Sequence, residues 1–114
     1  MRPITVSVAD ASVQAQYSPW VRFDDWAPNY ISIQCVVDGT VDYTVEYTLD
    51  DPNSPWDPVA INNVTWVASD DPDVVNATGN ATSNFIFAPT FARIKLNSGT
   101  GSVRATFLQS FGGV

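Results

Sequence analysis

The sequence predicts an all-β protein, an antiparallel β-sandwich of seven or eight short strands with jelly-roll-like or immunoglobulin-like connectivity. Helical periodicity is nearly absent, whereas short segments alternate apolar and polar residues and are rich in β-branched and aromatic side chains. Turn-forming residues separate these segments at intervals of about 8–12 residues, as in sandwiches and barrels. With 114 residues, the chain is expected to form a single domain, 1–114, around one core.

The first predicted strand covers residues 3–10. Ile4, Val6 and Val8 share one face, and Thr5 and Ser7 share the other. A proline at position 3 indicates a strand near a sheet edge. Residues 11–16 are small and polar, and they predict a turn or a short strand.

Residues 17–30 are rich in aromatic side chains. Alternation of Val21 and Phe23 with their polar or bulky neighbours predicts a short strand at 20–24, and the second half of the segment reads as a loop.

Residues 31–49 show the clearest alternation in the chain. Odd-numbered positions are apolar in both arms, and Asp38-Gly39 between them is a strong hairpin signal. A three-residue loop, 37–39, aligns the apolar faces, pairs Cys35 with Val41 and places Gly39 at positive φ. The alternative is that the two arms belong to different sheets.

Prolines at 52, 55 and 58 predict an ordered surface loop anchored by Trp56. Short strands are expected at 64–68 and 85–88. The segment between them, 69–84, reads as a long connection with one weak strand at 73–77.

The last unit, 90–109, is predicted to be a second hairpin. Ala92, Ile94 and Leu96 share a face, as do the apolar residues of the second arm. A turn centred on Gly99-Thr100 would pair Leu96 with Val103.

Composition excludes several classes of function. Twelve acidic residues against five basic ones argue against nucleic acid as a partner, because phosphate binding needs Lys and Arg. No apolar run approaches the ~18 residues of a membrane span, and no signal peptide is visible. The single Cys35 has no internal disulfide partner, and its place on an apolar strand face predicts a buried thiol.

The chain also offers little catalytic chemistry, because it contains no histidine and one cysteine. These counts remove the commonest general base and the usual zinc ligands, so neither an enzyme nor a cofactor is expected. Asp51, Asn53 and Asp57 are weak calcium candidates, as are the acids at 70, 71 and 73. The alternative is that these acids initiate turns.

The aromatic residues are the remaining candidates. Trp66, flanked by strand residues, is expected in the core, and others near prolines are expected at an interface with a partner. The interface candidates are Trp20, Phe23, Trp26, Tyr30, Trp56, Phe85 and Phe91.

The second half of the chain contains an ordered series of fold-like motifs. They are the segments VEYTLDDP (45–52), VTW (64–66), FIFAP (85–89), FARIKL (91–96), NSGTGSV (97–103) and ATFLQ (105–109). This series, within 44–110, resembles small all-β virion structural proteins of tailed bacteriophages. The resemblance implies a particle protein that is assembled in the host cytoplasm, and it carries no catalytic residues.

We therefore expect a non-enzymatic capsid decoration or cement subunit that contacts the major capsid protein or other virion proteins. A homo-oligomer is expected, with a trimer as one candidate state, and no membrane or nucleic acid partner is expected. The alternative is a head-fibre, tail or baseplate module that stacks Trp26 and Trp56 on a host glycan. An oligomeric tail connector is a third hypothesis.

Overall fold

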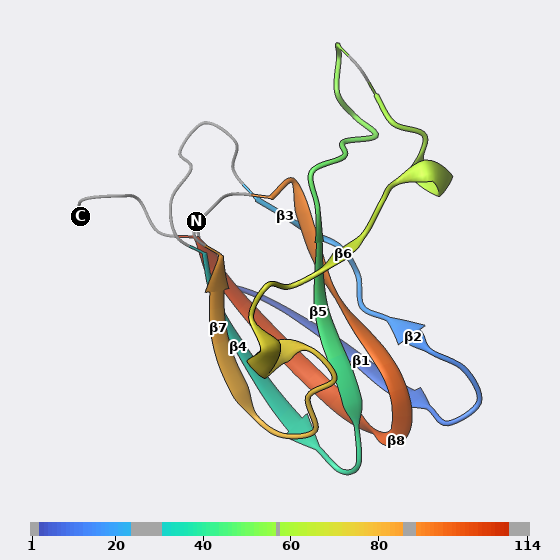
Figure 1. Ribbon diagram of the computed structural model, residues 1–114, viewed down its shortest axis with the longest axis vertical. Helices are drawn as coiled ribbons and strands as arrows, with labels where there is room; N and C mark the ends of the chain where they lie inside the picture. The colour runs from blue at the N-terminus through green and yellow to red at the C-terminus, as the bar shows by residue number, and fades with distance from the viewer. Residues whose placement is uncertain (1–2, 24–30, 57, 86–88, 110–114) are drawn as a thin grey trace.

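The computed structural model describes residues 3–23, 31–56, 58–85 and 89–109. It is all-β, an antiparallel curled sheet of eight strands, with no α-helix among the described residues (Figure 1). The strands are β1 (Ile4–Ala11), β2 (Gln16–Tyr17), β3 (Val21–Arg22), β4 (Ile31–Asp38), β5 (Asp42–Thr48), β6 (Val67–Ala68), β7 (Ala81–Phe85) and β8 (Phe91–Gln109). Two short 3-10 helices are η1 (Ile61–Asn63) and η2 (Pro72–Val74).

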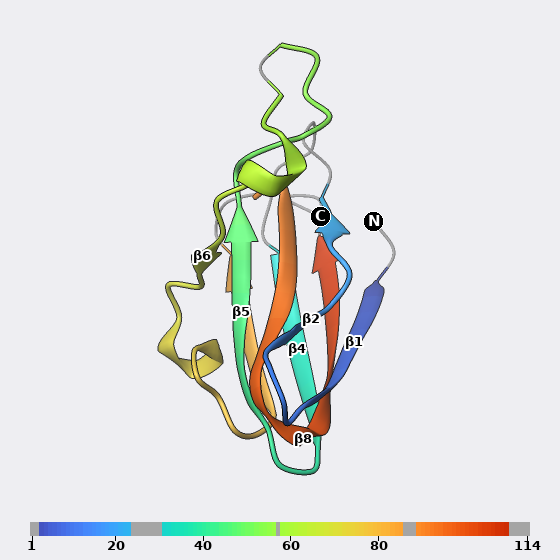
Figure 2. The ribbon, with the colours of Figure 1, turned by 90° about the vertical axis from the view of Figure 1, so that its right-hand side faces the viewer.

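The long strand β8 is the centre of the sheet. Its first half pairs with β5 on one side and with β2 and β3 on the other. Its second half pairs with β1 and β4. Strand β6 extends the sheet beyond β5, and β7 extends it beyond β4, so the sheet curls around β8 (Figure 2).

Two glycines allow β8 to reverse direction beneath the β4–β5 connection. Gly99 has a φ of 108°, and a Cβ at this position would overlap the carbonyl oxygen of Thr40. A Cβ at Gly101 would overlap the carbonyl oxygen of Asp38, and the Gly101 N–H donates a hydrogen bond to the Thr40 carbonyl at 2.9 Å. The two reversals therefore pack backbone against backbone, where only glycine fits.

The predicted hairpin at 31–49 is wrong, because its two arms do not pair with each other and are instead connected through β8. Strand β4 pairs with β7 and β8, whereas β5 pairs with β6 and β8. Cys35 lies between Ala81 and Ala105 rather than opposite Val41. Gly39 does have the expected positive φ, 89°.

The predicted hairpin at 90–109 fails in the same way. Leu96 lies beside Tyr43, and Val103 lies between Val8 and Val37. Alternation identifies which face of a strand is apolar, but two apolar faces can meet across a core as well as side by side in one ladder. Here they meet across the core.

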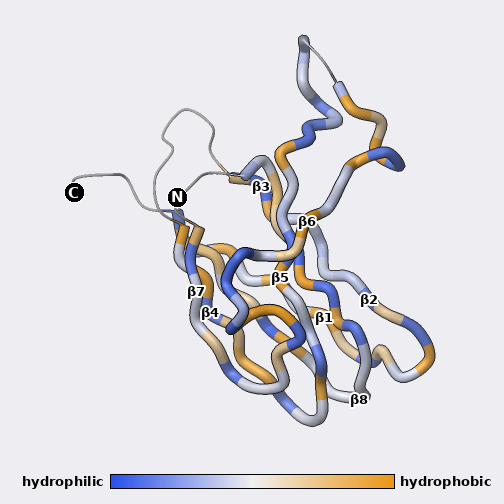
Figure 3. Tube along the Cα trace, viewed as in Figure 1, coloured by the Kyte–Doolittle hydropathy of each residue, from blue (hydrophilic) through white to orange (hydrophobic). Residues whose placement is uncertain are grey.

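The core lies inside the curl and is filled by the alternating positions of the central strands. Hydrophobic and hydrophilic residues follow one another along these strands (Figure 3). Two edge-to-face aromatic pairs cross it, Phe23 with Phe107 at 5.9 Å and Tyr47 with Phe85 at 5.5 Å between ring centroids. The largest fully buried side chains include Tyr43, Phe107, Ile31, Ile94 and Leu96.

The remaining strand predictions are confirmed in part. Strand β1 follows the predicted segment and lies at an edge, since it pairs only with β8. Among the described residues, the strand expected at 20–24 is limited to β3, with residue 24 outside them, and the strand expected at 64–68 is limited to β6. The weak strand at 73–77 is wrong, because η2 and a single bridge between Ala77 and Tyr43 replace it.

The strand expected at 85–88 keeps only its first residue in the described chain, as the end of β7, and 86–88 lie outside the described residues. Most of β7 falls in the segment that reads as a connection. Ser83 and Phe85 supply its buried positions, and a buried serine gives no hydrophobic signal.

Candidate docking site

Residues 50–65 form an arm that leaves the end of β5, projects beyond the sheet and returns to β6 (Figures 1 and 2). We call this segment the Asp-Pro arm; residue 57 lies outside the described chain. At its base the Thr65 N–H donates to Asp50 Oδ2 at 2.7 Å, and the Asp51 carbonyl accepts from the N–H groups of Ser54 and Val59 at 3.3 Å. These bonds close the arm on itself, and three prolines restrict its backbone.

The acidic residues of the arm form hydrogen bonds within its turn and contact residues where the arm joins the sheet. Asp51 Oδ1 accepts the Asn53 N–H at 2.9 Å, and Asp51 Oδ2 lies 3.5 Å from Arg22 Nη2. This arrangement is an Asx turn, the alternative considered for these acids. Asp57, the third calcium candidate, lies outside the described residues. Within 3–23, 31–56, 58–85 and 89–109, no three His, Cys, Asp or Glu side chains gather where they would hold a metal ion.

The arm exposes apolar side chains that the sheet does not cover. Trp56 and Ile61 of the arm are 91% and 63% exposed, and Leu49, the residue just before the arm, is 67% exposed. Burying one Trp side chain against a partner contributes on the order of 3–5 kcal/mol. An exposed apolar group on a restricted loop is thus available for docking without a large ordering cost.

The base of the arm adjoins a cluster of aromatic and arginine side chains on the outer side of the sheet. We call it the arginine–aromatic face, and its members are Tyr17, Trp20, Arg22, Trp66, Phe91 and Arg93. The Trp20 ring centroid lies 5.0 Å from that of Trp66 and 5.3 Å from that of Phe91, edge to face in both cases. The face therefore continues from the arm, through Trp66, onto the sheet.

Arg93 holds this face together. Its guanidinium carbon lies 4.1 Å from the ring centroids of both Tyr17 and Trp66. Its Nε donates to Glu46 Oε1 at 2.9 Å, and the two charged side chains are only 16% and 14% exposed. One side chain of β8 thus connects β2, β5 and Trp66, the residue before β6, by cation–π contacts and a short ion pair.

The predicted interface residues differ in how exposed their side chains are. Trp56 is exposed, and Trp20 is half-buried beside Trp66. Phe23, Phe85 and Phe91 are buried within the single chain, because they pack on neighbouring aromatic rings, so they leave little surface for a partner. Trp26 and Tyr30 lie outside the described residues.

One further placement differs from the expectations for the aromatic residues. Trp66 is not in the core but half-buried on the outer face, because it stacks on Arg93. Arg93 and Tyr17 were not singled out by sequence reasoning. The only signal for Arg93 is its outward position in the alternation of β8.

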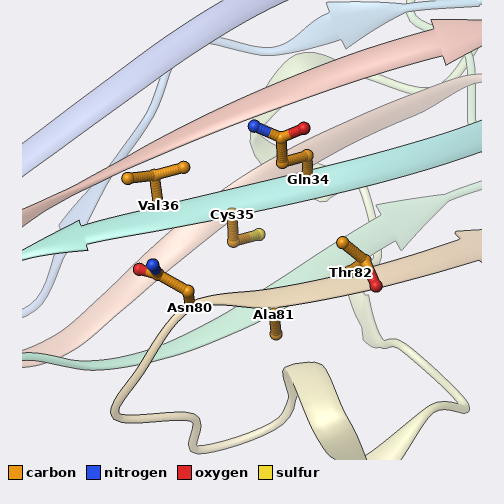
Figure 4. Close-up of a pocket in the computed structure, with 6 residues that line it drawn as sticks. All are labelled: Gln34, Cys35, Val36, Asn80, Ala81 and Thr82. Atoms are coloured by element: carbon orange, nitrogen blue, oxygen red, sulfur yellow. The ribbon is translucent and has the colours of Figure 1, made fainter.

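A shallow pocket of about 340 Å³ lies between β4 and β7, lined by Gln34, Cys35, Val36, Asn80, Ala81 and Thr82 (Figure 4). Cys35 is the titratable group in this lining. Burial raises the pKa of Cys35 to about 11, and a hydrogen bond to the Tyr43 hydroxyl opposes this rise. The Tyr43 hydroxyl in turn donates to the Gly79 carbonyl at 2.8 Å. At neutral pH Cys35 is therefore a buried, protonated thiol, as its strand position predicts.

No protein-family model, curated protein or solved structure matches this chain. Within the described residues, no helix has the length and apolarity needed to cross a membrane.

Proposed function

We propose that this chain is a non-enzymatic structural subunit of a tailed-phage particle, a capsid decoration or cement protein that docks through the Asp-Pro arm. The observation that carries the proposal is Trp56, which is 91% exposed on a projecting, proline-restricted loop. Tryptophans in such positions are typical binding hot spots when a partner covers them. The resemblance of residues 44–110 to small virion proteins supplies the kind of partner, a capsid protein.

The arrangement of the strands in two ladders around one core bears on the type of β fold. Two ladders, one made by β1, β4, β7 and the second half of β8, the other by β2, β3, β5, β6 and the first half, place their apolar sides on a common core. We propose that this arrangement is a β-sandwich of the jelly-roll-like or immunoglobulin-like type. A rigid sandwich would hold the arm at a fixed position relative to the shell.

The experiment uses particles from which the protein has been removed. Wild-type protein, Trp56→Ala and the control Val13→Ala are added back, and survival after heat and osmotic shock is measured. Val13 is 94% exposed in the β1–β2 turn, away from the arm (Figure 1). We expect wild type and Val13→Ala to restore stability. Trp56→Ala should bind about 30- to 700-fold more weakly, which corresponds to about 2–4 kcal/mol.

Particles that survive unchanged without the protein would overturn the proposal. A glycan array tests the alternative function, which is recognition of a host glycan. Glycan binding by wild type that disappears in Trp56→Ala would assign the arm to sugar binding instead.

A further inference from the structure

Strand β1 has one open edge from Ile4 to Ala9, before the bulge at Asp10. It pairs only with β8, and it contains no proline, lysine or arginine between Ile4 and Ala11. The other edge strands of the described sheet are protected. Strands β2, β3 and β6 have two residues each, and η2 lies along β7, where the Ser83 hydroxyl donates to Asp71 Oδ2 at 2.7 Å. Natural proteins usually block a long flat edge such as β1.

Hydrogen bonding in the neighbouring strands shows which backbone groups of β1 face this edge. The Val37 N–H donates to Asn80 Oδ1 at 2.8 Å, so it points away from β8. Val37 pairs with Val103, and antiparallel pairs alternate between bonded and non-bonded. The backbone groups of Val103 therefore point to the other side of β8, toward Val8 of β1.

The same alternation along β1 identifies the backbone N–H and C=O groups that point away from β8. Ile4, Val6 and Val8 bond to β8, so the N–H and C=O groups of Thr5, Ser7 and Ala9 point outward from the edge. Within the described chain, no backbone hydrogen bond outside the strand ladders reaches these groups. They form a regular row of donors and acceptors that fits an added antiparallel strand.

The charge pattern identifies the partner that fits this row. Each copy carries a net charge of −7, so two copies repel except where acidic side chains are absent. Residues 4–9 carry no charge, and the outward neighbours on β8 are Ser102, Arg104 and Thr106, which include one base and no acid. The β1 edge is thus a surface on which a second copy of this acidic chain can approach.

We propose that two copies of the chain associate by antiparallel β1–β1 pairing, with a two-fold axis at Ser7. This register opposes Ser7 to Ser7 and Thr5 to Ala9 on the outer face, and Val6 to Val8 on the inner face. Small uncharged residues meet outside and apolar ones inside, so no like charges are opposed. The bulge between Ala9 and Ala11, where Asp10 has a φ of 58°, ends the pairing.

Such a contact is isologous and closes with two copies, so it predicts a dimer rather than a trimer. The inference adds to the proposed function and does not rest on it, because β1 and the arm are separate surfaces. Trp56→Ala is therefore expected to remain dimeric, and failure of either proposal can be recognised independently.

Sedimentation equilibrium over a range of concentrations tests the pairing. Wild type should approach twice the chain mass of 12.4 kDa. Ser7→Lys places two ammonium groups opposite each other and should weaken the dimer at least ~10-fold. Ser32→Lys is the matched control, because Ser32 is exposed on the same sheet but paired on both sides by β7 and β8; it should leave the dimer unchanged.

A cross-link tests the register. In a bonded antiparallel pair the Cα atoms lie about 5.5 Å apart, within disulfide range. Ser7→Cys should therefore form a covalent dimer on oxidation, whereas Ser32→Cys should not, and the native Cys35, 1% exposed, does not compete. A monomer at every concentration, a mass of three chains, or equal behaviour of Ser7→Lys and Ser32→Lys would overturn the proposal.

Discussion

At the scale of single residues, Arg93 shows why a charge can be placed beside aromatic rings on a sheet face. Its guanidinium is planar, so it stacks on Tyr17 and Trp66 while its Nε bonds Glu46. A lysine would keep the charge and lose the stacking. The residue thus acts through its shape as well as its charge.

Arg93→Lys is expected to lower the free energy of unfolding by about 1–2 kcal/mol, and Arg93→Ala by about 2–4 kcal/mol, because the latter also leaves Glu46 without its partner. Urea denaturation measures both values. Lys95→Ala, which changes the next outward residue of β8, is the control and should stay within about 0.5 kcal/mol. Equal stability of the lysine variant and wild type would contradict the stacking role.

Asp71 shows how a single carboxylate connects a loop to a sheet. Its Oδ1 accepts the Asp73 N–H at 2.9 Å, and its Oδ2 accepts the Ser83 hydroxyl at 2.7 Å. These two hydrogen bonds, the backbone one first, hold the pKa of Asp71 below its usual value. The side chain thereby fixes η2 against the edge of β7.

The lowered pKa of Asp71 determines how the stability of the Asp71→Asn variant should depend on pH. A lowered pKa in the folded state stabilises the fold above the unfolded-state pKa of about 3.9, and that contribution is lost as pH falls through the folded-state pKa. The variant should therefore be less stable than wild type at pH 7, and the difference should shrink below about pH 4. Thermal unfolding across pH checks this, with Asp70→Asn as a charge-matched control. A difference that grows on acidification would contradict it.

At the scale of elements, the two chain reversals decide how the strands pair. The alternation of residues 31–49 identifies the inward residues Ile33, Cys35 and Tyr43, and all three are buried. It does not distinguish a hairpin from two strands facing each other across the core. That choice depends on the contact of the β4–β5 connection with Gly99 and Gly101, which are distant in sequence.

Gly99→Ala should therefore be strongly destabilising. The new Cβ meets the Thr40 carbonyl, and Gly99 has a φ of 108°, which alanine rarely adopts. We expect a loss of about 2–4 kcal/mol in the free energy of unfolding. Gly79→Ala is the matched control, since a Cβ there meets nothing within 4 Å, and its effect should stay within about 1 kcal/mol. Equal effects of the two variants in urea denaturation would contradict the packing of the two reversals.

Elements without a hydrophobic signal were the hardest to predict. Strand β7 begins at Ala81 in a run of Thr, Ser and Asn, and its pairing with β4 comes from the ladder rather than from its own side chains. Residues 73–77 have apolar positions, yet Asp71 and Pro72 start η2 there. Tertiary pairing and turn chemistry therefore decide these segments, not local propensity.

At the scale of the whole molecule, the sequence was informative about fold class and about the arm. The all-β class and the surface position of the proline-rich loop are confirmed, because alternation and proline act locally. The prediction that Trp56 anchors this loop is wrong, since its side chain is 91% exposed. The arginine–aromatic face was not predicted as a unit. Its members come from residues 17–22, 66 and 91–93, and only the curl of the sheet brings them together.

A map of the tailed-phage particle in which we propose this protein to lie is the most direct test of its proposed role in docking. We predict that the sheet lies on the outside of the shell, with the Asp-Pro arm inserted at the joints between capsomers and Trp56 covered by the capsid protein. A particle without this chain, or one in which the arm points into solvent, would contradict the proposal.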